Sequence, residues 1–140
     1  MPMMPDLARL KDFAKRYTAA WCSQNAASVG AFFAPNGSLS VNGSPAIGRH
    51  AITEVAQGFM SAFPDMVLRM DDVCIEGDHA VYHWTFIGTN TGRGGTGHPV
   101  RFSGVEEWKI GEDGLIAESR GQFDNAEYQR QLEHGVEESR

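Results

Sequence analysis

The spacing of apolar residues changes half-way along this sequence, and no other feature constrains the fold as strongly. Up to Pro64, apolar residues recur every three to four positions, which is the spacing of one helical face. Asp6 is a suitable N-cap for the first of these stretches. The pattern predicts helices over residues 6–25, around 29–33, and over 48–63.

Beyond residue 65 the pattern is typical of long strands joined by glycine-containing hairpin connections. The turn signal Pro35-Asn36-Gly37 should precede a short strand over 39–42, and a short helix over 125–131 should follow the last long strand. Helices followed by strands predict an α+β fold, with N-terminal helices packed on the concave face of a strongly curved antiparallel sheet. The long strands are expected over residues 66–76, 80–89, 100–110 and 115–124.

The length of 140 residues predicts a single domain over residues 1–140, with flexible termini at about 1–5 and 135–140. The chain has 12 Lys and Arg against 18 Asp and Glu, a net charge of −6, so we expect no nucleic-acid or anionic membrane partner. It has no apolar stretch of signal-peptide or membrane-span length, which predicts a cytoplasmic protein. No motif indicates a cofactor, and His79 and His83 would lie roughly 13 Å apart on a strand, too far to share a metal.

Short strings distributed over almost the whole chain resemble the nuclear transport factor two superfamily, and in particular its SnoaL-like polyketide cyclase and ester cyclase branch. None is specific alone, but their order matches. The strings are Phe33-Ala34-Pro35, Gly48-Arg49-His50-Ala51-Ile52, Phe63-Pro64-Asp65, Gly77-Asp78, Trp84-Thr85-Phe86, Gly88-Thr89, Asp113-Gly114-Leu115-Ile116, Phe123-Asp124 and Gln131-Leu132.

This resemblance implies a cone-shaped, cystatin-like fold with one pocket between the sheet and the helices, and a homodimer formed through the sheet. The superfamily includes cyclases, isomerases, dehydratases, epoxide hydrolases and non-catalytic transport proteins. Fold alone therefore does not decide the function of this chain.

Asp124, at the end of the last strand, is the first candidate for an acid–base residue, because the cyclase branch that the chain resembles keeps an aspartate there. Alternation along the strand places Glu118, Arg120, Gln122 and Asp124 on one face, where they would form a polar pocket wall. Two alternatives stay open. Asp124 could cap the helix that follows, and a bulge within residues 119–123 would turn this face outward.

Glu106 is the second acidic candidate and shares a strand face with Trp108. It falls where the steroid isomerase branch places an acid that donates a hydrogen bond to a developing oxyanion. It could equally form a buried ion pair with Arg120. The base of that branch would fall near Val41 or Asn42, and neither is a carboxylate, which argues against a steroid isomerase mechanism.

The remaining candidates are aromatic, polar or histidine side chains expected near the pocket. Tyr17 and Trp21 lie one helical turn apart on the core-facing side of the first helix and could offer a hydroxyl and an indole donor. His83 could carry a proton or polarise an oxygen, or be a structural histidine. The expected substrate-binding residues are Tyr17, Trp21, Phe59, Trp84, Trp108 and Gln122, and the expected catalytic residues are Asp124, Arg120, Glu106 and His83.

Three functions are compatible with these residues. The first is a cofactor-independent lyase, isomerase or cyclase acting on a small hydrophobic carbonyl compound through an acid–base carboxylate. The second is a non-catalytic module that binds a hydrophobic molecule or a protein partner, favoured if Asp124 and Glu118 are exposed and aromatics alone line the cavity. The third, epoxide or ester hydrolysis, requires Arg120 to lie between Glu106 and Asp124.

Overall fold

Four helices and six strands make up residues 6–136, the part of the chain that this computed structural model describes. Asp6 caps the first helix by accepting a hydrogen bond from the backbone N–H of Arg9 at 2.9 Å. The elements are α1 (Leu7–Trp21), α2 (Ala26–Gly30), β1 (Phe33–Val41), β2 (Ser44–Ile47), α3 (Arg49–Ala62), β3 (Val67–Glu76), β4 (His79–Thr89), β5 (Pro99–Ile110), β6 (Ile116–Phe123) and α4 (Asn125–His134).

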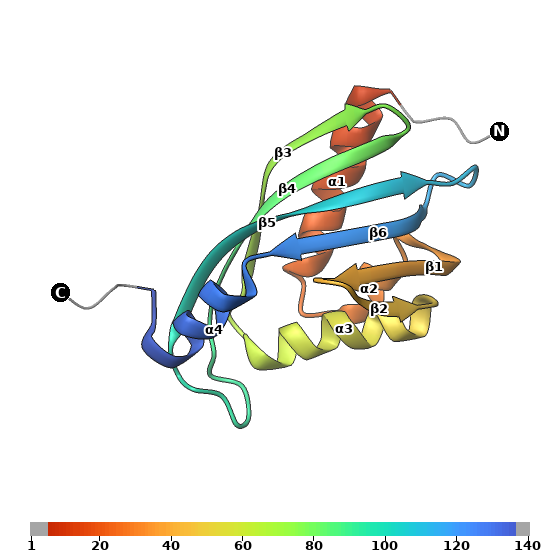
Figure 1. Cartoon of the computed structure of the whole chain (residues 1–140). Coiled ribbons are helices and arrows are strands. Elements are labelled where there is room, and N and C mark those ends of the chain that lie inside the picture. Colours follow the sequence, from red (N-terminus) through yellow and green to blue (C-terminus); the bar gives the residue numbers. More distant parts are fainter. Residues whose placement is uncertain (1–5, 137–140) are drawn as a thin grey trace.

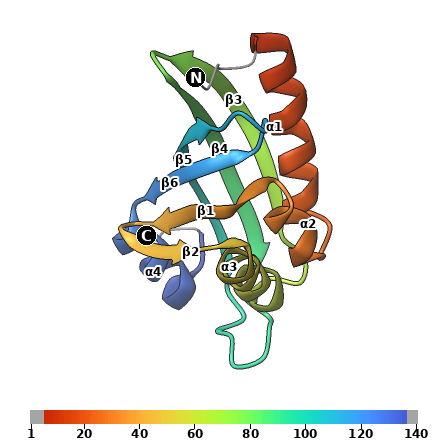
Figure 2. The same cartoon turned by 90° about the vertical axis from the view of Figure 1, so that its right-hand side faces the viewer.

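The six strands form one curled, unclosed sheet in the order β2-β1-β6-β5-β4-β3. Helices α1, α2 and α3 lie on one side of it, and α4 lies beside β5, as Figures 1 and 2 show. The apolar core fills the space between the sheet and α1–α3, with Leu10, Tyr17 and Ile52 from the helices fully buried against Tyr82 and Trp108 from the strands. The α+β fold with a curved sheet and helices on one face is therefore confirmed.

The expected elements agree with the structure best where long periodic stretches predicted them. The third helix, the four long strands and the last helix are confirmed, and the first helix ends at Trp21 rather than Asn25. Pro35-Asn36-Gly37 is not a turn before the strand but lies inside β1, where the pairing with β6 is irregular between Phe33 and Ser38. The short edge strand β2 was missed because it contains Pro45, which an edge strand tolerates.

One pair of strands runs against expectation. All neighbours in the sheet are antiparallel except β1 and β6, which pair in parallel, so the sheet is mixed. Strand β1 follows α1 and α2, and β6 is the last strand along the chain, so the segment between them includes β2, α3 and three long strands. A connection of this length can bring β6 alongside β1 running in the same direction, which a hairpin cannot.

A bulge at the start of β6 decides which side chains of that strand face the core. Ile110 of β5 pairs with Ile116, but the preceding residue, Lys109, pairs with Glu118, so Ala117 is an extra residue. Ile116 faces the core, and after the bulge Ser119 also faces inward while Glu118 faces outward. One extra residue thus exchanges the two faces of the strand.

The expectation of flexible termini concerns residues 1–5 and 135–140, and of these only 135 and 136 are described. No helix within residues 6–136 is long and apolar enough to span a membrane.

Candidate functional site

An apolar cavity of about 60 Å³ lies between the inner face of the sheet and the helices. Its wall combines Trp21 of α1 and Phe59 of α3 with inward-facing residues of the strands. Val41, Phe59 and Phe123 are the lining side chains that remain partly exposed. The full lining is Trp21, Leu39, Val41, Phe59, Leu68, Trp84, Phe86, Phe102, Glu106, Gly121 and Phe123.

Within the described part of the chain, Glu106 is the one ionisable residue that lines this cavity. Its side chain is held by three hydrogen bonds to a single oxygen. The Tyr17 hydroxyl donates to Oε1 at 2.9 Å, the Trp108 indole N–H at 3.0 Å and the Ser119 hydroxyl at 2.7 Å. Glu106 is only 7% exposed. The three donors come from α1, β5 and β6, so the fold itself fixes the position of this carboxyl group.

The second carboxyl oxygen of Glu106, Oε2, accepts no hydrogen bond from residues 6–136. With three donors Oε1 is saturated, so a proton bound to Glu106 must reside on Oε2. Gly121 pairs with Glu106 across the sheet, and a Cβ there would lie 3.6 Å from Cγ of Glu106. The lack of a side chain at Gly121 therefore leaves open the space beside the carboxyl group.

Burial raises the pKa of Glu106 above its ordinary value of 4.5, and the hydrogen bonds from Trp108, Ser119 and Tyr17 only partly oppose this increase. The pKa of the Tyr17 hydroxyl is raised well above 10.0, first by burial and then by the nearby charge of Glu106. Tyr17 therefore remains a protonated donor at any physiological pH. The site combines a buried carboxyl group with a tyrosine that holds it in place.

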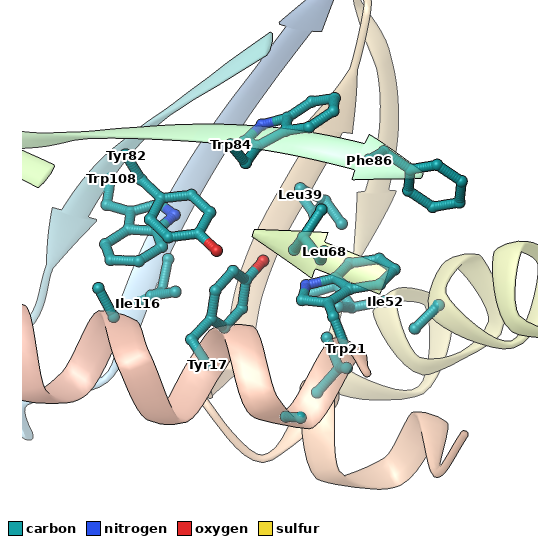
Figure 3. Close-up of a cluster of buried hydrophobic side chains, with 14 of the residues drawn as sticks. Tyr17, Trp21, Leu39, Ile52, Leu68, Tyr82, Trp84, Phe86, Trp108 and Ile116 are labelled. Carbon is teal, nitrogen blue, oxygen red and sulfur yellow. The ribbon is translucent and has the colours of Figure 1, made fainter. Parts of the chain in front are cut away.

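Four of the expected site residues line the cavity, namely Trp21, Phe59, Trp84 and Glu106. Tyr17 and Trp108 are fully buried behind the wall and contact Glu106 rather than the cavity. Figure 3 shows Tyr17 rising from α1 toward Tyr82 and Trp108 on the strands. Their rings pack closely, with centroids 5.1 Å apart for Tyr17 and Trp108 and 4.8 Å apart for the stacked pair Tyr82 and Trp108.

The prediction that β6 forms a polar wall of the cavity is wrong. The bulge at Ala117 turns the strand face of Glu118, Arg120 and Gln122 to the outside. Arg120 and Gln122 are exposed. Arg120 lies 3.9 Å from Glu107, on the outer face, so the expected ion pair with Glu106 is wrong as well. The arginine between two acids that epoxide or ester hydrolysis requires is consequently not assembled.

Asp124 and His83 also lie away from the cavity. Asp124 is exposed and caps α4, accepting a hydrogen bond from the backbone N–H of Glu127 at 3.1 Å, which is the capping alternative. His83 lies on β4 between Tyr82 and Trp84, whose side chains face inward, and alternation therefore turns His83 to the outer face. The expected placement of both residues in the pocket is wrong.

A SnoaL-like polyketide cyclase family matches residues 11–132 of the chain, which include every residue of the cavity wall and of the Glu106 network. The chain belongs to this family. Among curated proteins, none has a sequence significantly similar to this one.

Solved structures share the fold of this SnoaL-like chain at low sequence identity. TsrD from Streptomyces laurentii has a TM-score of 0.79 at 24% identity, covering 92% of this chain and 98% of its own. A putative SnoaL-like polyketide cyclase from Jannaschia sp. CCS1 has a TM-score of 0.79 at 15% identity, with coverage of 96% and 98%. A hypothetical protein with a ketosteroid isomerase-like fold from Catenulispora acidiphila, in complex with trimethylamine, has a TM-score of 0.69 at 17% identity, with coverage of 79% and 83%.

These findings describe a small-molecule-binding protein of the SnoaL-like family. Within residues 6–136, no cluster of three or more His, Cys, Asp or Glu side chains could hold a metal ion. Among the described residues that line the cavity, Glu106 alone carries an ionisable side chain.

The sequence did not reveal several residues that line the cavity or contact Glu106 in this SnoaL-like chain. Ser119 was missed because the bulge exchanged the faces of β6, and nothing in the sequence marks the extra residue. Phe86 could have been found, since it continues the alternation of Tyr82 and Trp84 on β4. Gly121 carries no signal of its own, because its contribution is an absent side chain.

Replacing Asp124 with alanine should destabilise the fold by about 1 kcal/mol, because the cap of α4 is lost. Asparagine caps as well as aspartate, so Asp124→Asn should leave the free energy of unfolding nearly unchanged. Urea denaturation of both variants measures this difference. Equal stability of the two variants would contradict the capping role of Asp124.

Proposed function

We propose that this chain is a cofactor-independent enzyme of the cyclase, isomerase or lyase type that moves a proton on a small, mostly apolar carbonyl compound. Glu106 takes the acid–base role first expected of Asp124. The observation that supports the proposal is the free Oε2 of a buried carboxyl group, held by three donors at the wall of an apolar cavity. Burial of the charged form makes this carboxylate a stronger base than an exposed glutamate.

The proposed step begins with the ionised carboxylate of Glu106. Oε2 takes a proton from the carbon next to the carbonyl group, the C–H electron pair forms a C=C bond, and the carbonyl oxygen becomes an enolate oxygen. When solvent replaces the proton on Oε2 and the new proton is delivered to the same carbon, the result is exchange. In a substrate with a C=C bond next to that carbon, delivery of the proton to the far carbon of the double bond gives isomerisation. In a cyclase, the enolate carbon instead attacks a second carbonyl group, and Glu106 gives its proton to the alkoxide that forms.

A second candidate function, binding without catalysis, is favoured by the otherwise apolar wall. Asp124 is exposed and Glu118 faces outward, and aromatic and aliphatic side chains make up the rest of the lining. An acid in such a wall is expensive to bury unless it has a role. Glu106 therefore favours catalysis over binding alone. The homodimer and the cytoplasmic location remain predictions.

The test uses butanone, a small ketone with protons on both sides of the carbonyl group. In D₂O the intact protein should accelerate loss of the proton signals at C1 and C3 by NMR, while the C4 methyl signal stays constant as an internal reference. Because the carboxylate is the active form and its pKa is raised, the rate should rise with pH through a midpoint above 4.5 and then reach a plateau.

Exchange no faster than in buffer containing the same concentration of free glutamate, although butanone binds, would exclude Glu106 as the base. Binding without catalysis would then be the function that the cavity supports. A rate that keeps rising in proportion to hydroxide, without a plateau, would contradict the proposal in the same way.

A further inference from the structure

Two buried indole N–H groups in the cavity wall, those of Trp21 and Trp84, have no hydrogen-bond partner among residues 6–136. Both side chains are 7% exposed. Buried tryptophan N–H groups usually find an acceptor, because a buried donor without one keeps its full desolvation penalty. The third tryptophan, Trp108, follows this rule by donating to Glu106.

The ring of Trp84 is held in place by close packing. Its edge lies directly over Gly104, where an added Cβ would approach the ring to 2.5 Å. Phe102 and Phe123 pack edge-to-face against it, with centroids 5.7 and 5.9 Å away. The indole therefore cannot turn freely to satisfy its N–H elsewhere. The packing therefore fixes the unpartnered N–H of a residue that lines the cavity.

Trp21 contributes a second donor, which differs from the N–H of Trp84 in lying near the Tyr17 hydroxyl. Its N–H lowers the pKa of the Tyr17 hydroxyl, but it forms no hydrogen bond of acceptable geometry. In Figure 3 the indoles of Trp84 and Trp21 lie above and below Leu39 and Leu68, and both nitrogen atoms are on the side of the Tyr17 hydroxyl. That side of the cavity is also where Tyr17 meets Glu106.

We infer that the cavity contains a binding site for an acceptor oxygen of an uncharged ligand, with the Trp84 N–H as the principal donor and Trp21 as an auxiliary one. A carboxylate ligand is disfavoured, because no Lys or Arg among residues 6–136 lines the cavity and Glu106 would repel it. A hydrocarbon leaves the donors unsatisfied. An ammonium ion, which aromatic rings and a carboxylate can hold, also leaves them unsatisfied.

This inference deepens the proposed function and rests on it for the identity of the oxygen. The carbonyl oxygen, which gains negative charge when Glu106 takes a proton, would lie at the indole N–H. A neutral donor aimed at developing charge stabilises it without reorganisation. Trp84 would thus select a carbonyl substrate over its hydrocarbon counterpart and favour the enolate.

The experiment compares three probes of similar size: butanone, its isostere 2-methylbut-1-ene, and trimethylammonium. The full chain, labelled with ¹⁵N, gives three indole N–H signals, which single Trp→Phe variants assign. Butanone should shift the Trp84 signal downfield and leave that of Trp108 in place. It should also bind about tenfold more tightly than the alkene, the value of roughly one buried hydrogen bond.

Trp84→Phe should reduce the ratio of butanone to alkene affinity toward one. The ratio of the two affinities is the decisive readout, because the loss of ring packing lowers the affinity for both probes alike. A Trp84 signal that does not move at saturating butanone, an unchanged ratio in Trp84→Phe, or tighter binding of trimethylammonium than of butanone would each overturn the inference.

Failure of this inference and of the proposed function can be separated with Glu106→Gln. If this variant loses exchange but the affinity ratio does not depend on Trp84, the catalytic proposal stands and the oxygen site is wrong. If the ratio depends on Trp84 while the wild-type chain shows no exchange, the oxygen site stands and the catalytic proposal is wrong.

Discussion

Replacing Glu106 with glutamine is expected to slow the α-proton exchange of butanone by about 100-fold or more, the usual contribution of a general base. The amide oxygen of glutamine can still accept hydrogen bonds from Tyr17, Trp108 and Ser119. The amide nitrogen would take the place of Oε2 at the cavity wall and cannot accept a proton from carbon. The substitution therefore removes the base while keeping its anchor. NMR in D₂O, at a pH on the plateau of the wild-type rate, measures the loss.

The matched control is Glu107→Gln, one position along the same strand. Glu107 faces outward, 3.3 Å from His79, and does not line the cavity. This variant removes the same charge from the same strand and should exchange butanone at the wild-type rate. Equal losses in both variants would indicate a general effect of charge or folding and would refute the role of Glu106.

Stability as a function of pH gives a second readout for Glu106→Gln that does not require any ligand. The pKa of Glu106 is raised by folding, so the native state holds this proton more tightly than the unfolded chain does. Its stabilising contribution is complete below the ordinary value of 4.5 and is lost as pH rises through the raised pKa. The glutamine variant should lack this loss when unfolding is followed across the same pH range.

The sequence predicted the architecture well because long apolar periodicities carry most of the information about helices and strands. It predicted the connection around Pro35-Asn36-Gly37 poorly, since these turn-forming residues lie within β1, at an irregularity in its pairing with β6. It also missed the parallel pairing of β1 with β6. That pairing joins two strands that are separated along the chain by α3 and three long strands. No local sequence pattern encodes such a contact.

The site was predicted only in part, and for the expected polar wall on β6 the reason is a single residue. Ala117 bulges out of the ladder, and every side chain after it changes face relative to strict alternation. Arg120 and Gln122 therefore face outward rather than into the expected pocket, and Ser119 faces the core. Glu106 was placed correctly on the face of Trp108, because no irregularity separates these two residues within β5.

Trp108→Ala should have the largest effect on stability of any substitution in the Glu106 network, a loss of about 3–5 kcal/mol. Trp108 is fully buried and packs against Tyr17, Tyr82 and Phe13. Alanine leaves a cavity among these rings that the rigid sheet cannot close. Such a loss is a large fraction of the 5–15 kcal/mol typical of a whole domain. Urea denaturation, with far-UV circular dichroism as the signal, measures it.

Trp108→Phe separates the packing contribution of Trp108 from its hydrogen bond. Phenylalanine keeps an aromatic ring beside Tyr82, so it should destabilise the chain less than alanine does, but it removes the N–H that donates to Oε1 of Glu106. That donor lowers the pKa of Glu106, so its loss should move the midpoint of the pH–rate profile for butanone exchange upward. A purely structural Trp108 would leave the midpoint unchanged. An upward shift would instead show that Trp108 positions and tunes the carboxyl group whose free oxygen faces the cavity.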